Sequence, residues 1–247
     1  MAGIEESNPS LDRREVVRAA LTGAAAAAAG AVGAVPDSPE PSTPARAGAT
    51  RTRPTDPPAA LRELLAGNVR WRTLHESHPD RTRAVRQTLV SGQHPFAVVL
   101  GCVDSRVPPE LVFDQGLGDL LTVRSAGSVL DEAVLASITY GVLELAIPLV
   151  VVLGHQSCGA VTAAIHAADA RESLAGHMQY LVDQIRPAID RDLRGAARVD
   201  ATITANVRLV RSRVAAEPTL AAKVASGELA VIGARYELDN QSVHTTH

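Results

Sequence analysis

Two short segments hold the side chains of this 247-residue chain that are best suited to chemistry. They are Cys102-Val103-Asp104-Ser105-Arg106 and His155-Gln156-Ser157-Cys158, and together they contain both cysteines. Two thiolates and one imidazole are ligands that suit Zn²⁺. Three protein ligands leave a fourth position open, which is typical of catalytic zinc sites. The set Cys102, His155 and Cys158 therefore predicts a reactive metal centre.

An aspartate and an arginine stand close to this set. Asp104 follows Cys102 by two residues, and a carboxylate there can either orient a zinc-bound water or bind the metal itself. Arg106 decides between these roles, because a bidentate ion pair would hold the carboxylate ionised and off the metal. Their position beside a metal ligand favours a role in the site over a plain surface ion pair, which would contribute little.

Apolar patterning indicates the elements that must position these residues. Continuous apolar runs predict buried strands over 96–100, 120–123, 149–153 and 229–236. Helical spacing predicts helices over 60–72, 81–90, 129–145, 174–190 and 198–216, with Gly67 interrupting the first and Gly127-Ser128 capping the third. A further helix is expected to begin at 158–161. This alternation predicts an α/β fold with a mostly parallel central sheet flanked by helices. Cys102 and His155 follow strand ends, so we expect them to converge at the carboxyl edge of the sheet.

The motifs resemble those of the β-class carbonic anhydrases. The resemblance rests on the segments 101–110 and 154–160, on 114–120 and 123–127 between them, and extends from about 61 to 236. It implies that Cys102, His155 and Cys158 bind one Zn²⁺ per chain and that Asp104 and Arg106 form a catalytic dyad. The implied reaction is the reversible hydration of carbon dioxide, with zinc-bound hydroxide attacking carbon. It also implies a homodimer or homotetramer.

The chain departs from the family pattern at two places. The usual Arg-Asn-Ala-Gly-Asn reads Arg-Ser-Ala-Gly-Ser over 124–128, so two amides are replaced by the hydroxyls of Ser125 and Ser128. We expect this change to tune the site rather than abolish metal binding. One subgroup is gated by bicarbonate and carries a Trp three residues before the first cysteine, where this chain has Val99. We therefore expect an open site, with Asp104 paired to Arg106.

The N-terminal region has a different composition. Arg13-Arg14 precedes an uncharged, Ala-rich stretch, so residues 1–35 predict a twin-arginine-type signal segment rather than a buried helix of the domain. Residues 36–58 are rich in Pro, Ala and Thr, as linkers are. The folded domain is then 59–247. We expect export to the periplasm, the cell envelope or the exterior, with no stable membrane span because alanine transfers weakly into lipid.

Composition narrows the function classes. Hydrophobic residues make up 46% of the chain and the net charge is −3, which favours a large core and argues against nucleic acid as a partner.

Two rival functions keep the same ligands. One is hydrolysis of CS₂ or COS on this fold, and the other is a non-catalytic zinc protein in which Asp104 closes the site. A redox disulfide between Cys102 and Cys158 is less favoured, because redox pairs usually occur as Cys-x-x-Cys.

Overall fold

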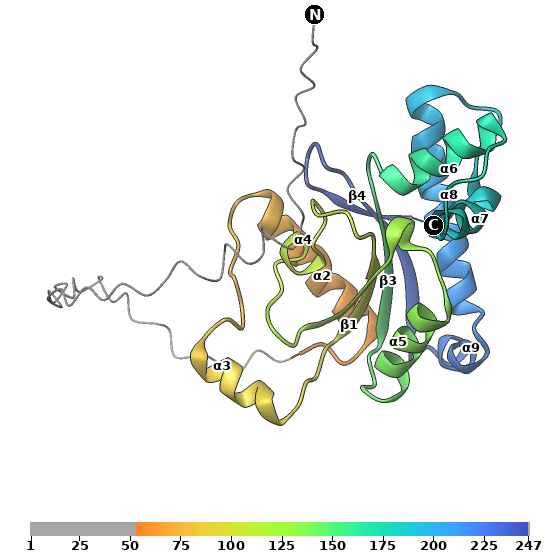
Figure 1. The fold of residues 1–247 in the computed structure, drawn as a ribbon. Coiled ribbons are helices and arrows are strands. Elements are labelled where there is room, and N and C mark those ends of the chain that lie inside the picture. The colour runs from red at the N-terminus through yellow and green to blue at the C-terminus, as the bar shows by residue number, and fades with distance from the viewer. Residues whose placement is uncertain (1–52, 247) are drawn as a thin grey trace, which may run out of the picture. The chain divides into compact units, whose positions relative to one another are not determined.

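The computed structural model describes residues 53–246 (Figure 1). The predicted signal segment, 1–35, and all but the last residues of the predicted linker, 36–58, lie outside the described residues. None of the helices within 53–246 combines the length and the apolar character that crossing a bilayer requires.

A five-stranded sheet forms the centre of the domain, in the order β2-β1-β3-β4-β5. Its strands are β1 (Ala97–Gly101), β2 (Leu120–Arg124), β3 (Leu149–His155), β4 (Ala230–Tyr236) and β5 (Val243–Thr246). The first four are parallel, and β5 runs antiparallel to β4. Every residue of β1 and β3 is buried, which explains their continuous apolar runs. The predicted α/β fold with a mostly parallel sheet is confirmed.

Helices cover both faces of this sheet (Figure 1). They are α2 (Pro57–Arg72), α3 (Arg83–Thr88), α4 (Pro109–Val112), α5 (Glu132–Leu143), α6 (Gly159–Ala170), α7 (Met178–Ile185), α8 (Gly195–Ala215) and α9 (Pro218–Ser226). Side chains alternate across β1, so Val98 packs among α5, α8 and α9 while Val99 packs among α2 and α4. Apolar layers therefore cover both faces of the sheet, and the polar residues of the predicted site lie at its carboxyl edge.

Several predicted boundaries were wrong for local reasons. The helix expected over 129–145 begins at Glu132, because Asp131 caps it by accepting a hydrogen bond from the backbone N–H of Val134 at 2.8 Å. Gly127 and Ser128 instead have φ of 67° and 55° in a short 3₁₀ turn, η2 (Ala126–Ser128). The strand β5 and the helix α9 were not predicted, since neither carries a long apolar run.

Gly67 does not interrupt α2, as the sequence had suggested. It lies inside the helix and is buried, where a Cβ atom would stand 1.8 Å from the carbonyl oxygen of Phe113. The missing side chain thus lets α2 pack directly on the backbone that follows α4. Close approach, rather than backbone freedom, is the reason for glycine at this position.

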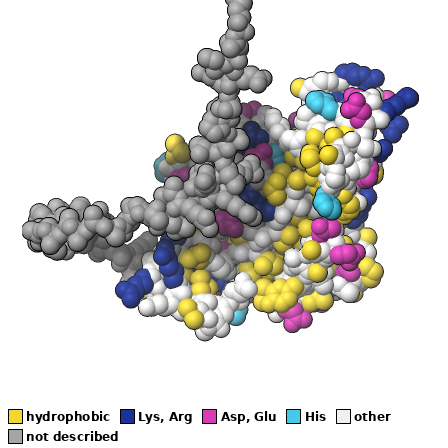
Figure 2. Space-filling view, in the orientation of Figure 1, with side chains coloured by type: hydrophobic (Ala, Val, Ile, Leu, Met, Phe, Trp, Pro, Cys, Tyr) yellow, Lys and Arg dark blue, Asp and Glu magenta, His cyan; other side chains and the backbone are white. Residues whose placement is uncertain are grey.

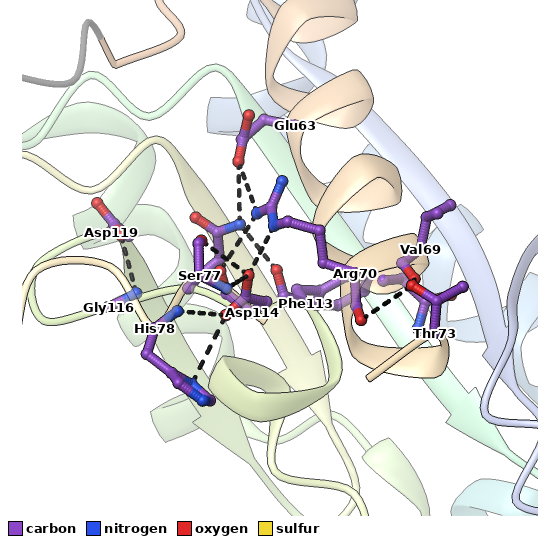
Figure 3. Close-up of polar contacts among 12 residues, drawn as sticks. Glu63, Val69, Arg70, Thr73, Ser77, His78, Phe113, Asp114, Gly116 and Asp119 are labelled. Carbon is purple, nitrogen blue, oxygen red and sulfur yellow. Dashed lines mark hydrogen bonds and ion pairs between the residues drawn. The ribbon is translucent and has the colours of Figure 1, made fainter. Parts of the chain in front are cut away.

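A polar cluster beside this contact holds α2 to two loops (Figure 3). The buried carboxylate of Asp114 accepts hydrogen bonds from Arg70 Nε at 2.6 Å, from the N–H and hydroxyl of Ser77 at 2.9 and 3.0 Å, and from the N–H of His78 at 3.0 Å. Burial raises the pKa of Asp114, but the bonds from Arg70 and Ser77 outweigh it and leave the pKa lowered. Asp114 therefore stays ionised and ties the helix to residues 77–78.

The contact at Gly67 gives a test of this packing. Alanine favours helix by about 1 kcal/mol over glycine, but here the Cβ would collide with backbone. We expect Gly67→Ala to lower the free energy of unfolding by about 1–3 kcal/mol, as overpacking does, measured by urea denaturation. Gly92→Ala is the control, because a Cβ there meets nothing within 4 Å. Equal stability of the two variants would contradict the contact.

Candidate metal centre

Three elements bring the predicted ligands together at the carboxyl edge of the sheet. Cys102 follows β1, His155 is the last residue of β3, and Cys158 is the N-cap residue of α6. One ligand atom from each lies within 4.8 Å of the other two, and all three residues are buried. Both cysteines are free thiols, so no disulfide joins them. The convergence expected from the strand ends is present.

The imidazole of His155 is oriented toward the two thiols. Its Nδ1 lies 2.9 Å from the carbonyl oxygen of Gln156, so Nδ1–H donates there and Nε2 keeps its lone pair. Nε2 is buried and has no hydrogen-bond partner among the described residues. A buried polar atom left unpaired costs about 1–3 kcal/mol. A metal ion at this point would satisfy Nε2, and imidazole with two sulfurs is a donor set that fits zinc.

The two thiols affect each other's ionisation. Their interaction lowers the pKa of Cys102 and raises that of Cys158, so Cys102 is the one that ionises first. The backbone N–H of Gly127 also donates to the sulfur of Cys102, at 3.3 Å. A bound metal cation would hold both groups as thiolates.

Asp104 is paired with Arg106 next to these ligands. Arg106 Nε and Nη2 donate to the two carboxylate oxygens at 2.9 and 2.8 Å, and its backbone N–H donates to Oδ1 at 3.0 Å. Arg106 thereby holds the pKa of Asp104 well below its usual range. Asp104 Oδ2 lies 3.9 Å from His155 Nε2, too far for a hydrogen bond. The carboxylate thus stays ionised and beside the ligands.

Two residues that support the site were not found from the sequence. Arg124 donates to the carbonyl oxygens of Cys102 and Asp104, at 2.8 and 2.7 Å, and so fixes the loop after β1. Asn206 on α8 donates to the carbonyl oxygen of Gly127 at 2.9 Å, and so fixes the peptide that reaches Cys102. Arg124 had been noted only as part of the family pattern. A single Asn within a helix gives no signal of its own.

The departures from the family pattern are accommodated locally. Ser125 donates to the carbonyl oxygen of Val129 at 2.7 Å, and Ser128 donates to that of Leu153 at 3.3 Å. Both hydroxyls therefore hold backbone around the η2 turn. Val99 is fully buried in the core between the sheet and α2, away from the ligands.

Comparison with known proteins agrees with this geometry. The family model described as carbonic anhydrase matches residues 97–243. Carbonic anhydrase 2 of Mycobacterium tuberculosis (strain CDC 1551 / Oshkosh) is 42% identical over 188 residues, which cover 75% of this chain and 91% of that protein. Among solved structures, the Coccomyxa β-carbonic anhydrase in complex with acetazolamide is 25% identical, with a TM-score of 0.60 over 75% of this chain and 85% of that one. A structure of tetrameric β-carbonic anhydrases from Sordaria macrospora is 20% identical, with a TM-score of 0.60 over 75% and 95%.

The chain therefore belongs to the carbonic anhydrase family, and its fold places it in the β class. It is accordingly a carbonic anhydrase, an enzyme that interconverts carbon dioxide and bicarbonate. The resemblance stated from the motifs is confirmed.

The link from Asn206 to Gly127 yields a prediction about stability. Removing the amide would leave the buried Gly127 carbonyl without its donor, so we expect Asn206→Ala to lower the free energy of unfolding by about 1–3 kcal/mol. Ser212→Ala, an exposed position on the same helix, should change it by less than about 0.5 kcal/mol. Urea denaturation measures both. Unchanged stability of Asn206→Ala would remove this bond from the support of the site.

Proposed function

We propose that Cys102, His155 and Cys158 bind one Zn²⁺ and that Asp104 and Arg106 act as a catalytic dyad in carbon dioxide hydration. The observation that carries the proposal is the buried, unpaired Nε2 of His155 beside two free thiols. Zinc held by these three ligands supplies a Lewis acid that makes water a competent nucleophile near neutral pH.

Asp104 receives the orienting role in this proposal. Its carboxylate is only partly exposed and lies beside the three ligands, so it can accept a hydrogen bond from the attacking water and direct the oxygen lone pair. Arg106 fills one side of the carboxylate with three donated bonds and keeps it from turning toward the ligands. Each residue thus acts through geometry, since near-attack placement is itself a large part of catalysis.

The proton released by the reaction must leave the site by another group. Carbon dioxide and water give bicarbonate and one proton, and the lowered pKa of Asp104 prevents that carboxylate from keeping the proton near neutral pH. Asp104 is therefore an acceptor of a hydrogen bond and not a store of the proton. Solvent or buffer takes the proton, because the dyad is open to water through the half-exposed Arg106.

The dyad is tested by measuring hydration and zinc content on the same samples. We expect Asp104→Asn to keep zinc and to lose about 10²–10⁴-fold in turnover, the range for a group that handles a proton or orients water. Cys102→Ser should lose zinc together with activity. Asp192→Asn, an exposed aspartate, is the control and should keep both.

The outcomes separate the alternatives. Normal turnover in Asp104→Asn would remove Asp104 from the mechanism, and full zinc in Cys102→Ser would overturn the ligand assignment. Full zinc without hydration in the unaltered protein would point to a closed, non-catalytic site. Hydrolysis of CS₂ or COS in its place would point to a different small substrate.

We further propose that residues 1–35 direct export and that 36–58 is a linker to the catalytic domain. The support is the Arg13-Arg14 pair ahead of an uncharged apolar stretch. Replacing Arg13 and Arg14 with Lys should retain the protein in the cytosol, as fractionation of cells would show. If the unaltered chain were found only in the cytosol at full length, the export proposal would fail.

An assembly of two or four copies is also proposed. The Sordaria macrospora structure is of tetrameric enzymes, and here α5 leaves the apolar side chains of Tyr140 and Leu143 about half exposed. Analytical ultracentrifugation measures the state, and a monomer at micromolar concentration would contradict the proposal.

A further inference from the structure

Five arginines surround a hollow at the corner of the domain away from the metal centre. The hollow has a volume of about 550 Å³ and is lined by Arg171, Arg186, Arg191, Arg194, Arg198 and a single acidic residue, Asp169. These residues come from the C-terminal end of α6, the turn η3 (Arg186–Ala188) that follows α7, and the start of α8. Figure 2 shows Lys and Arg side chains gathered at the corner where Figure 1 places α6 and α8.

Carboxylates offset only part of the charge of these guanidinium groups. Arg198 is buried and pairs with Asp169 at 2.8 Å, and the exposed Arg186 pairs with Asp183 at 3.2 Å. Within residues 53–246, Arg171, Arg191 and Arg194 form no ion pair with a carboxylate. Asp190 lies between Arg171 and Arg191 in sequence; its carboxylate accepts the backbone N–H groups of residues 192 and 193, and it also interacts electrostatically with Arg198 and Arg194. Three carboxylates thus interact with five guanidinium groups, so the hollow keeps an excess of positive charge.

The start of α8 adds to this excess. The helix has 21 residues, and its N-cap residue, Arg194, makes no side-chain capping bond. Its first turn holds no acidic residue, so the N–H groups there lack both a cap and a compensating charge. Arg194 and Arg198 place this positive helix end at the hollow. One guanidinium nitrogen of Arg194 donates to the carbonyl oxygens of Arg191 and Leu193, and these bonds fix the position of the Arg194 side chain.

The arrangement matches a particular ligand chemistry. A guanidinium group is a planar fork that binds a phosphate or carboxylate through two parallel hydrogen bonds. One small anion occupies one or two such forks, whereas this hollow offers the uncommitted forks of Arg171 and Arg191 with the remaining nitrogens of three more arginines, and it has room for a larger molecule. Bicarbonate, a small monoanion, would neutralise little of the charge. We propose that the hollow binds an anion that carries two or more phosphate groups.

The hollow is separate from the metal centre. Cys158 stands at the N-terminal end of α6 and Arg171 at its C-terminal end, and the 12 residues between them span about 16–18 Å. None of the lining residues contributes to the metal-centre geometry described above. The proposed binding therefore does not depend on carbonic anhydrase activity, and it can be measured with or without turnover.

Titration calorimetry of the full-length protein with inorganic triphosphate tests the proposal at about 150 mM salt, where weak surface attraction is screened. We expect saturable binding, weakened at least about tenfold in the double variant Arg171→Gln/Arg191→Gln, which removes two fork donors. These two side chains make no hydrogen bond that supports the described fold, so folding should be unaffected. Arg81→Gln/Arg83→Gln, which removes the same charge from exposed positions elsewhere, is the matched control and should bind normally.

A second experiment distinguishes a soluble phosphate ligand from the headgroups of a membrane. Sedimentation with phosphatidylglycerol vesicles, compared with phosphatidylcholine vesicles, reports binding to clustered lipid headgroups. Binding of triphosphate alone assigns a soluble ligand, and binding to the anionic vesicles alone assigns a membrane headgroup. In either case Arg171→Gln/Arg191→Gln must be the defective variant. Absence of saturable binding in both arms, or an equal loss in Arg81→Gln/Arg83→Gln, would overturn the proposal.

Discussion

The parallel pairing of β1 with β3 is the constraint on which the site depends. Val98 to Gly101 pair in register with Val150 to Leu153, so both strands reach the same edge and release the chain there. Cys102 then leaves β1 opposite the end of β3, where His155 closes its strand. The register holds because both faces of these strands are apolar and buried, and a slip by one residue would exchange the two faces. The packing of the core thereby fixes where Cys102 and His155 lie.

Hydrogen bonds then refine what the sheet provides. Three groups of the site are each held by another residue: His155 by the Gln156 carbonyl, Cys102 by the Gly127 amide, and Asp104 by Arg106. Such outer partners set the orientation and charge state of the groups that react. These partners lie in loops, and Asn206 on α8, which packs against β3 and β4, in turn donates to the Gly127 carbonyl. The site is therefore assembled across the domain rather than within one segment.

The features that could be predicted from the sequence are those that depend on residues close together along the chain. Apolar runs predicted the buried strands, and the spacing of cysteine, histidine, aspartate and arginine predicted the residues that lie together at the carboxyl edge of the sheet. Interactions between distant segments carried no such mark. Gly67 was read as a helix breaker because its partner, the Phe113 backbone, lies far along the chain. Asn206 was missed for the same reason, and β5 because only its pairing with β4 makes it a strand.

Cys158 has two positions at once, as a proposed metal ligand and as the first boundary residue of α6. A helix is stiff, so a residue at its tip cannot move without carrying the axis with it. A tilt of a few degrees at one end shifts the other end of a 12-residue helix by about 1 Å. A shift of Cys158 at the metal centre and a tilt of α6 therefore accompany each other. Arg171, the C-cap residue at the other end of α6, would move with the same tilt.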